Sequence, residues 1–416
     1  MIEVRLARTG VSAAPVTETA PADVLRLAAG KLGRDLPGGR TVLARPGLAG
    51  DRLAAFVEGL ALGGYRYSLA TGAPRPKRTV ELADVTDAEA VEAGVRAAEA
   101  TAWARDLANT PSSVKTPAWL GRQAADVLPA FGVDVEVHDP DWLAEHGFGG
   151  VLAVGAGSSG PPCLIEASWR PRGSARGPHV VLVGKGITFD TGGLNIKLGE
   201  GMKTMKTDMS GGAAVLAAIR LVAAERVPVR VTALVPAAEN AFGASSYRPG
   251  DVVRHVGGRT SEITNTDAEG RIVMADALAY AAARLRPSVL VDVATLTGAM
   301  KVALGLHTGG LFATSDDLAA QLTRAGDAAG EPLWRMPLSA EYESSLDSDV
   351  ADANNAPGNP GAITAALFLQ HFTGGLPWAH LDIAGPGRAA KDDGMFSKGA
   401  TGFGARLLAR WIGGLA

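Results

Sequence analysis

The sequence predicts an α/β fold with a small N-terminal α/β domain and a larger C-terminal α/β domain, whose mainly parallel central sheet lies between helices. Strand-like and helix-like apolar segments alternate from residue 179 onward, which is typical of strand–helix–strand units. The strand-like segments are continuously apolar, as expected for strands buried on both faces. The 416 residues exceed the roughly 250–300 at which one hydrophobic core stops growing, so we expect two domains.

The N-terminal domain is predicted over residues 1–87. This part is rich in alanine, glycine and arginine and contains the short apolar runs TVLA and LAAFVEGLALG. It contains few residues that suggest catalysis or ligand binding. A helix is expected to follow and to link this domain to a C-terminal domain over residues 107–416.

The linking helix is predicted over residues 88–106, within an alanine-rich segment that extends from Thr86 to Ala108. Thr86 is a suitable N-cap, and Glu89 three residues later completes a capping box. The segment DLANTPSSVKTP ends the helix, because its two prolines cannot continue the hydrogen-bond pattern.

The C-terminal domain is predicted from its apolar segments. Three continuously apolar segments are expected to be strands: 179–184, 229–237 and 288–296. Four longer segments are expected to be helices: 210–225, 271–285, 362–372 and 402–415. The order strand, helix, strand, helix, strand implies a mainly parallel sheet.

The composition excludes several classes of protein. Hydrophobic residues make up 47% of the chain and charged residues 20%, which is typical of a globular protein. The formal net charge of −3 argues against a nucleic-acid partner and an anionic-membrane partner. The single cysteine, Cys163, excludes an internal disulfide bond and a cluster of metal-binding thiolates.

The sequence shows no targeting or membrane segment. The first residues, MIEVRLARTG, lack the apolar h-region of a secretory signal. Runs of 18 or more uncharged apolar residues are absent, since even VLVDVATLTGAM contains Asp292. We therefore expect a soluble, cytoplasmic protein without a membrane partner.

Two polar segments, 184–212 and 265–271, follow predicted strands or precede predicted helices. Ligands bind at such strand ends in open α/β sheets. The two segments contain seven charged residues set among glycines: Lys185, Asp190, Lys197, Asp208, Asp267, Glu269 and Arg271.

Simpler interpretations account poorly for these segments. A dinucleotide site needs a third glycine where Phe189 stands, and a P-loop needs Ser or Thr where Gly186 follows Lys185. Asp267 or Glu269 taken alone could merely cap the following helix. That interpretation does not explain why both segments are acidic.

Four carboxylates in one crevice repel one another unless cations join them. Asp190, Asp208, Asp267 and Glu269 carry four negative charges, which two divalent ions balance. Ligands rich in oxygen and free of cysteine suit a pair of fairly hard divalent metals rather than a structural zinc. Such pairs hydrolyse amides or phosphate esters, so the residues alone indicate a two-metal hydrolase.

The motifs themselves resemble those of a known family. GKGITFDTGG, MKTDMSGGAAV and above all NTDAEGR are similar to signatures of the leucyl aminopeptidases, the cytosol aminopeptidase or M17 family. The resemblance continues through ENAFGASSYRPGD, DVATLTGAM, GAITAALFL, PWAHLDIAGP and KGATGFGARLL, and covers roughly residues 97–412. Residues 1–87 show no match and are shorter than the family's usual N-terminal domain.

The resemblance implies a role for each metal ligand. Lys185 corresponds to the lysine that binds the tightly held metal through a neutral amine, which requires a strongly lowered pKa. Asp208 corresponds to a ligand of that same site, and Asp267 to a ligand of the exchangeable site. Asp190 and Glu269 correspond to ligands shared by both metals.

The residues alone leave alternatives for two of these ligands. Lys185 could be a surface lysine in a glycine-rich loop. Asp208 could instead form solvated ion pairs with Lys203 or Lys206, which flank it.

The resemblance also assigns catalytic and substrate-binding residues. Lys197 corresponds to the charged lysine that stabilises the tetrahedral gem-diolate, and Arg271 to the arginine that holds a bicarbonate ion, the proposed general base. Met205 corresponds to a residue of the pocket for the N-terminal side chain, with Thr295 and Ala400 as further candidates. Taken alone, Lys197 could extend from a strand to solvent, Arg271 could be exposed at a helix start, and Met205 could fill the core.

The function implied by the resemblance is hydrolysis of the N-terminal residue from peptides or dipeptides with a free N-terminus. We expect two divalent ions per chain, zinc or manganese first, with magnesium or cobalt as alternatives, and a homohexamer. One alternative is a dipeptidase or peptide-processing hydrolase dedicated to one pathway, for example of the Cys-Gly type. Another is a DNA-binding regulatory member of the family, which the net charge of −3 disfavours.

Overall fold

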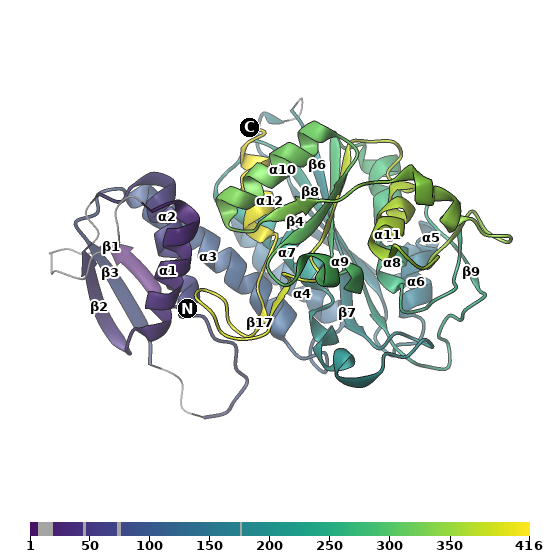
Figure 1. The fold of residues 1–416 in the computed structure, drawn as a ribbon, viewed down its shortest axis with the longest axis horizontal. Coiled ribbons are helices and arrows are strands. Elements are labelled where there is room, and N and C mark those ends of the chain that lie inside the picture. Colours follow the sequence, from purple (N-terminus) through teal and green to yellow (C-terminus); the bar gives the residue numbers. More distant parts are fainter. Residues whose placement is uncertain (7–19, 45–46, 73–75, 175–176) are drawn as a thin grey trace.

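The computed structural model describes residues 1–6, 20–44, 47–72, 76–174 and 177–416. A small parallel sheet of order β1-β3-β2 forms the N-terminal part, at the left of Figure 1. Its elements are β1 (Glu3–Leu6), α1 (Ala22–Asp35), β2 (Gly39–Ala44), α2 (Gly50–Gly63) and β3 (Arg78–Ala83). The two helices and the sheet share one hydrophobic cluster with the next helix along the chain.

Helix α3 (Ala88–Asn109) connects this part to the large sheet. The predicted helix is therefore present, but the predicted cap is wrong. Asp87, rather than Thr86, is the N-cap, because its carboxylate accepts a hydrogen bond from the amide of Ala90 at 3.0 Å. The other carboxylate oxygen of Asp87 accepts from the amide of Gly50, which ties the helix start to α2.

The large sheet has nine strands in the order β13-β12-β15-β11-β6-β8-β5-β4, with β7 beside β8. The strands are β4 (Asp134–His138), β5 (Cys163–Trp169), β6 (His179–Gly184), β7 (Gly186–Asp190), β8 (Arg230–Asn240), β11 (Val289–Ala294), β12 (Gly309–Ala313), β13 (Leu333–Arg335) and β15 (Trp378–Asp382). The central strands β15, β11, β6 and β8 pair in parallel, as do β7 with β8 and β12 with β13. Pairing is antiparallel only for β12–β15, β5–β8 and β4–β5 within this described sheet, so the predicted mainly parallel sheet is confirmed.

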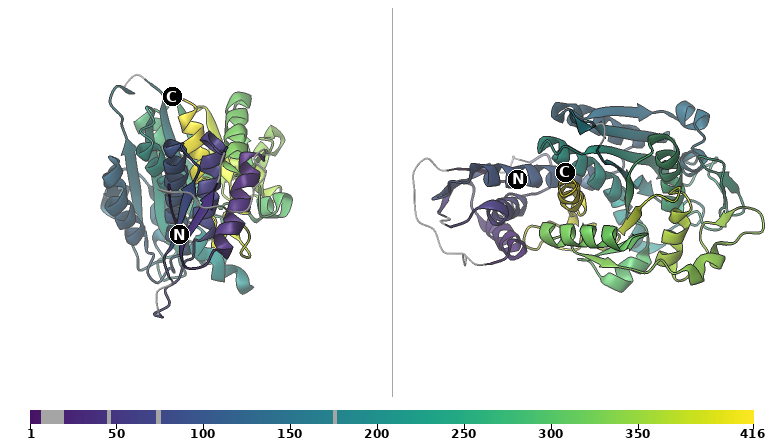
Figure 2. Two further views of the ribbon diagram at one scale, coloured as in Figure 1. Left: turned by 90° about the vertical axis from the view of Figure 1, so that its left-hand side faces the viewer. Right: turned by 90° about the horizontal axis from the view of Figure 1, so that it is seen from above.

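Helices cover both faces of this sheet (Figure 2). Alternate residues of β6 point to opposite faces of the sheet. Val180 and Leu182 belong to the hydrophobic cluster on one face. Val181 and Val183 belong to the cluster on the other face. One cluster includes α3, α4 (Pro117–Val127), α7 (Ser210–Ala224), α10 (Asp316–Ala329) and α12 (Ala405–Gly413). The other includes α5 (Pro140–Glu145), α6 (Gly149–Gly155), α8 (Glu269–Tyr280), α9 (Gly298–Leu304) and α11 (Gly361–Gln370).

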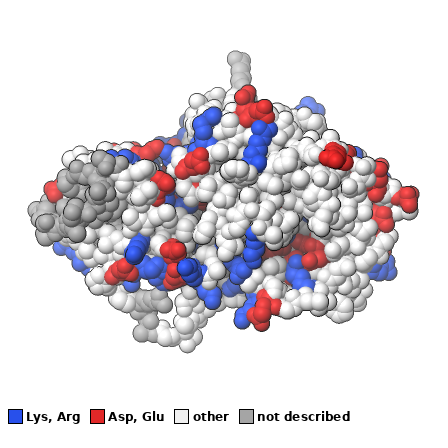
Figure 3. All heavy atoms as spheres, viewed as in Figure 1, with Lys and Arg blue, Asp and Glu red and all other residues white. Residues whose placement is uncertain are grey.

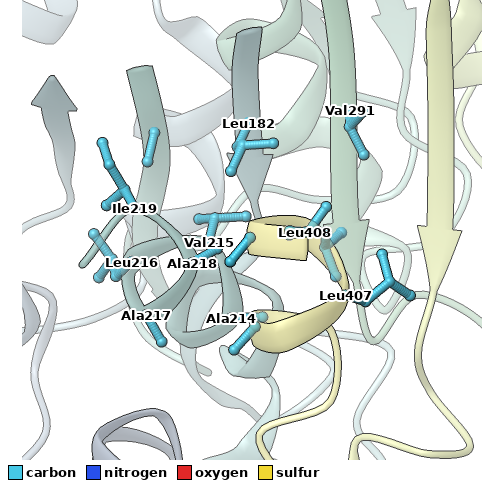
Figure 4. Packing of buried hydrophobic residues seen from close by; sticks show 14 of the residues in the cluster. Leu182, Ala214, Val215, Leu216, Ala217, Ala218, Ile219, Val291, Leu407 and Leu408 are labelled. Atoms are coloured by element: carbon cyan, nitrogen blue, oxygen red, sulfur yellow. The ribbon is translucent and has the colours of Figure 1, made fainter. Parts of the chain in front are cut away.

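Helix α7 is the most deeply buried of the predicted helices. Ala214, Val215 and Ala218 pack between β6 and α12 (Figure 4). The stretch Gly199–Ala224, which contains α7, is long and apolar enough by composition to cross a membrane, but 89% of its most apolar window is buried inside the protein. Its hydrophobicity is thus that of a core helix.

Two predicted helices differ at their ends. Helix α8 begins at Glu269 and gives way to a π-helical turn (Ala281–Leu285), whereas the prediction placed one helix over 271–285. Helix α12 begins only at Ala405, because Gly402 and Gly404 have φ angles of 73° and 97°, outside the right-handed helical region.

Short elements complete the fold. A three-stranded sheet is formed by β9 (Val252–Arg254), β10 (Thr260–Glu262) and β14 (Ala353–Asn354), and a two-stranded ladder by β16 (Arg388–Ala389) and β17 (Gly399–Ala400). Among the described residues, 3₁₀ segments include Leu128–Phe131, Gly199–Thr207 and Ala340–Leu346.

Candidate metal centre

Strand ends and helix starts bring the predicted acidic residues together. Lys185 follows β6 directly, and Asp190 is the last residue of β7. Asp208 lies two residues before α7, and Glu269 is the first residue of α8. Carboxyl ends of parallel strands are where ligands bind in open α/β folds, and helix N-termini favour negative charge.

Lys185 lies between two of these carboxylates. Its Nζ is 2.7 Å from Oδ2 of Asp208 and 2.8 Å from Oε1 of Glu269, and it donates to the carbonyl oxygen of Thr295 at 3.2 Å. The lysine is only 3% exposed, so the alternative of a surface lysine is wrong.

Lys197 lies between the other two carboxylates. Its Nζ is 2.8 Å from Oδ2 of Asp190 and 2.5 Å from Oδ1 of Asp267. Asp190, Asp267 and Glu269 each offer an oxygen that lies within 4.8 Å of the others, close enough for a shared cation. The structure therefore gathers all five predicted metal ligands and Lys197 in one place.

Two glycines allow this close approach. A Cβ atom at Gly270, in the motif NTDAEGR, would lie 2.6 Å from Cε and 2.8 Å from Nζ of Lys185. A Cβ atom at Gly211, in the motif MSGG, would lie 2.0 Å from the carbonyl oxygen of Val293. Side chains at these positions would displace the lysine and the start of α7. Close packing therefore explains why glycine occupies these two positions of the motifs.

Asp208, Asp267 and Glu269 hold protons more tightly than usual, because their pKa values are raised. Burial, followed by the charge of Asp190, raises the pKa of Glu269 to about 8. Burial also raises the pKa of Asp208 to about 6, and burial together with Asp190 raises the pKa of Asp267. When all four carboxylates are ionised, they outnumber the two lysines that face them, so the protein groups alone then carry an excess of negative charge.

The two lysines are stabilised in their charged forms by the protein groups alone. Burial lowers the pKa of Lys185, but attraction to Asp208 and Glu269 outweighs it, and the net pKa lies above the usual range. The same balance raises the pKa of Lys197. The low pKa expected for Lys185 as a metal ligand thus depends on cations, which would both repel its proton and compete for its carboxylate partners.

Arg271 is buried near this cluster and is 8% exposed, so the alternative of an exposed arginine is wrong. It lies in the first turn of α8 and donates through Nη1 to the carbonyl oxygen of Asn355 at 2.8 Å. Burial lowers its pKa to about 10, which leaves the side chain charged at neutral pH. Its Nε is buried and makes no hydrogen bond in the structure, so a donor remains for an anion.

A cavity of about 640 Å³ opens onto the carboxylates, and both Met205 and Thr295 line it. Ala400 is not among its lining residues; it is 1% exposed and donates its amide to Oδ1 of Asn109. A second cavity of about 390 Å³ is lined by Arg271 and shares Lys197 with the first. In Figure 3, acidic atoms lie inside a hollow with basic atoms beside it.

The lysines that flank Asp208 do not pair with it. Lys203 lies 3.8 Å from Glu200, and Lys206 donates to the carbonyl oxygen of Asn109 at 2.8 Å. The carboxylate of Asp208 instead accepts a hydrogen bond from Thr295 at 2.7 Å, in addition to its contact with Lys185. The alternative of solvated ion pairs for Asp208 is therefore wrong.

The sequence alone did not indicate the side chains that orient these candidate ligands. Asn240, the last residue of β8, donates to Oδ1 of Asp190 at 2.7 Å and to the carbonyl oxygen of Thr266 at 3.0 Å. The side chain of Asn355 accepts from the amide of Thr264 and donates to the carbonyl oxygen of Asn265, which fixes the NTDAEGR loop. The only sequence signal was a polar residue at the end of an apolar strand.

The donor set fits divalent cations. Oε2 of Glu269 is buried and accepts no hydrogen bond, so an acceptor points into the cluster without a protein donor. Buried acceptors of this kind are costly unless a cation or donor meets them. Oxygen atoms and one amine are suitable ligands for fairly hard divalent metals.

Comparison with known proteins identifies the family. A model described as "Cytosol aminopeptidase family, catalytic domain" matches residues 102–409. The chain belongs to the cytosol aminopeptidase family. A probable cytosol aminopeptidase of Roseiflexus castenholzii is 47% identical over 367 residues, which cover 85% of this chain and 75% of the relative. As a member of this family, the protein is a metallo-aminopeptidase.

Solved structures show the same fold. A structure titled "Bottromycin maturation enzyme BotP in complex with Mn" has a TM-score of 0.90 at 40% identity and covers 95% of this chain and 88% of that chain. Another structure of BotP has a TM-score of 0.88 at 36% identity and covers 100% of this chain and 99% of that chain. The cytosol aminopeptidase of Coxiella burnetii has a TM-score of 0.85 at 37% identity, with 93% of this chain and 83% of that chain covered.

Proposed function

We propose that this aminopeptidase uses two divalent ions to hydrolyse the bond after the N-terminal residue of a peptide or dipeptide. The observation that carries the proposal is the excess of negative charge among four clustered carboxylates, three of which have raised pKa values. Burying such a set is unfavourable for the protein alone and favourable once cations are bound.

Five side chains would hold the metals. Lys185 and Asp208, which are in contact, are proposed as ligands of the tighter site, and Asp267 of the exchangeable site. Asp190 and Glu269 are proposed as shared ligands, since both have oxygen atoms close to those of Asp267. Zinc or manganese is proposed first, and the manganese in the BotP structure supports a divalent metal. When bound, the two ions polarise the scissile carbonyl and lower the pKa of the attacking water.

Lys197 is proposed to stabilise the developing negative charge. Its ammonium contacts Asp190 and Asp267, and cations at these carboxylates would release its N–H donors toward the substrate. A donor already in place before negative charge develops lowers the barrier without reorganisation. In the protein without metals, the neighbouring carboxylates raise the pKa of Lys197 and keep its ammonium charged in the neutral range.

Arg271 is proposed to hold an anion beside the reacting water. Its contact with Asn355 fixes the guanidinium, and its unpaired Nε is left for an acceptor such as bicarbonate. A bicarbonate held there could take the proton of the water as general base. The N-terminal side chain of the substrate is proposed to occupy the larger cavity, against Met205 and Thr295.

The second candidate function is the processing of a single peptide substrate in one pathway. The chain covers 99% of one BotP structure and 88% of the other, compared with 75% of the Roseiflexus relative. We therefore propose, as an alternative, that the protein processes the precursor peptide of one maturation pathway. We also propose a homohexamer and, from the names of the relatives, a cytoplasmic location.

Reconstitution with single metals and a substrate panel tests these proposals. The metal-free enzyme should be inactive on leucyl-p-nitroanilide and should regain activity with Mn²⁺ or Zn²⁺. Broad hydrolysis of aminoacyl-p-nitroanilides would support a general aminopeptidase, and restriction to one or two peptides would support the dedicated role. Full turnover at less than about 0.1 metal ion per chain would contradict the two-metal proposal.

A further inference from the structure

The wall of the larger cavity carries basic side chains away from the metal centre. Lys203, Lys301 and Arg388 line it, and Glu200 is the acidic side chain beside them. Lys203 is paired with Glu200 at 3.8 Å, and the two side chains are 81% and 92% exposed, so solvent screens that pair. Lys301 and Arg388 remain as unbalanced positive charge on this wall.

Arg388 is the more informative of the two cations. It lies in β16 and is half-buried, whereas Lys301 is exposed on α9. Within the described part of the chain, its guanidinium has neither a hydrogen bond nor an ion pair. Because Arg388 lines the cavity and its five guanidinium donors meet no described protein acceptor, water or a bound anion must satisfy them.

The ladder between β16 and β17 places Arg388 close to the predicted substrate pocket. Arg388 is directly opposite Ala400 in this antiparallel ladder. Arg388 lines the cavity, whereas Ala400 is buried and does not. Of this pair, Arg388 is therefore the residue that can contact a side chain held in the cavity.

A substrate carboxylate is the chemical partner that this arrangement lacks. Guanidinium groups bind carboxylates through two parallel hydrogen bonds, which are stronger than bonds between neutral groups. The carboxylates of the metal centre are not available, because they contact Lys185 and Lys197 and are proposed to hold cations. Lys301 adds a second positive charge to the same wall.

We propose that Arg388 is a specificity-determining residue that binds an acidic side chain on the N-terminal residue of the substrate. The inference rests on the proposed function, which places that side chain in the larger cavity. Arg388 lines this cavity together with Met205 and Thr295, and it does not line the second cavity with Arg271. The substrate class is therefore peptides that begin with glutamate or aspartate.

Matched p-nitroanilides test the proposal, because they carry no C-terminal carboxylate. For the manganese-loaded enzyme, kcat/KM for glutamyl-p-nitroanilide should exceed that for the glutaminyl compound by about tenfold, as for a partly exposed hydrogen bond to a charged group. Arg388→Gln should reduce this ratio to about one, and Arg388→Glu should favour lysyl- over glutaminyl-p-nitroanilide. Arg335→Gln, at an exposed arginine of β13 that pairs with Asp316, should leave the ratio unchanged.

Each other outcome has a definite meaning. Equal rates for the glutamyl and glutaminyl compounds in the wild-type enzyme, with leucyl-p-nitroanilide hydrolysed, would overturn the inference and leave the proposed function intact. A preference confined to dipeptides with a free C-terminus, lost in their amides, would overturn it by assigning Arg388 to the C-terminal carboxylate. Absence of hydrolysis for every compound would instead count against the proposed function. Metal content of each variant shows that the centre is intact.

Discussion

The protein contains two buried clusters of charged residues with opposite character. The first, called here the structural ion cluster, consists of Arg26, Glu58, Glu331 and Arg406, and it joins α1 and α2 to α12. The second is the metal centre described above. Glu58 and Glu269 are both almost fully buried, yet the pKa of Glu58 is lowered, because Arg406 and Arg26 outweigh its burial, whereas the pKa of Glu269 is raised to about 8.

Charge balance accounts for the difference. In the structural ion cluster two arginines meet two glutamates, and the second oxygen of Glu331 accepts from the amide of Leu407 at 2.9 Å. In the metal centre the carboxylates outnumber the lysines, and Oε2 of Glu269 has no donor. Burial alone therefore does not distinguish a functional cluster from a structural one; the unbalanced charge does.

Glu269→Gln should have the largest effect of the substitutions that test the difference between the two clusters. The change removes a proposed shared ligand, so activity should fall at least as far as the roughly 10³-fold expected when one major electrostatic contribution is lost. In the metal-free protein the same change removes repulsion between carboxylates and should raise Tm. Calorimetry measures Tm, and kinetics on leucyl-p-nitroanilide measure activity. A lowered Tm in the metal-free protein would show that protein groups already balance the charge of Glu269.

Lys197→Ala should separate catalysis from ligation within the metal centre. Since Lys197 is proposed to stabilise charge in the transition state, kcat should fall by roughly 10²–10³ while metal content stays constant. Arg271→Ala should cost less, because free bicarbonate can partly substitute. Elemental analysis accompanies the kinetics; parallel loss of metal and activity in Lys197→Ala would assign that residue to ligation.

Glu58→Gln should affect stability and not catalysis. The change removes the carboxylate that Arg26 contacts and leaves Arg406 with Glu331, so the free energy of unfolding should fall by about 3 kcal/mol. Activity per folded molecule and metal content should match the wild type. Urea unfolding monitored by circular dichroism gives the first quantity; an unchanged stability would mean that this cluster contributes little to the fold.

Competition between protons and metal ions for Glu269 should give the smallest of the expected effects. Metal ligands must be deprotonated, and the pKa of Glu269 is raised to about 8, so binding below this pH displaces a proton and affinity falls as the pH decreases. The slope of log affinity against pH should therefore steepen by about one unit below pH 8. Glu269→Gln should abolish the steepening, and a wild-type slope that is constant from pH 6 to 9 would contradict the raised pKa.

The sequence predicted those parts of the fold that depend on local patterns. Strand β6 was recognisable because Val180–Val183 face two hydrophobic clusters in turn, and α7 because it is apolar on all sides. The end of α8 and the start of α12 were misplaced, since a π-helical turn and two glycines in left-handed conformations are not visible as periodicity. The short ladder that positions Arg388 depends on contacts between distant segments and could not be predicted.

The same distinction applies to the site. Lys185, Asp190 and Glu269 could be predicted as candidates because they lie in polar, glycine-containing segments at strand ends or helix starts. Asn240 was missed because an asparagine at a strand end has many uses, and only the structure shows its bond to Asp190. The individual roles of the ligands remain predictions.

The central claim is that unbalanced carboxylates bind two cations, and stoichiometric metal titration tests it most directly. Isothermal titration of the metal-free protein with Mn²⁺ should give two ions per chain for the wild type and one for Asp267→Ala, which should empty only the proposed exchangeable site. Asp208→Ala and Lys185→Ala should weaken the tight site, and Asp190→Ala should weaken both. Two tightly bound ions in Asp267→Ala, or a single ion in the fully active wild-type enzyme, would contradict the account.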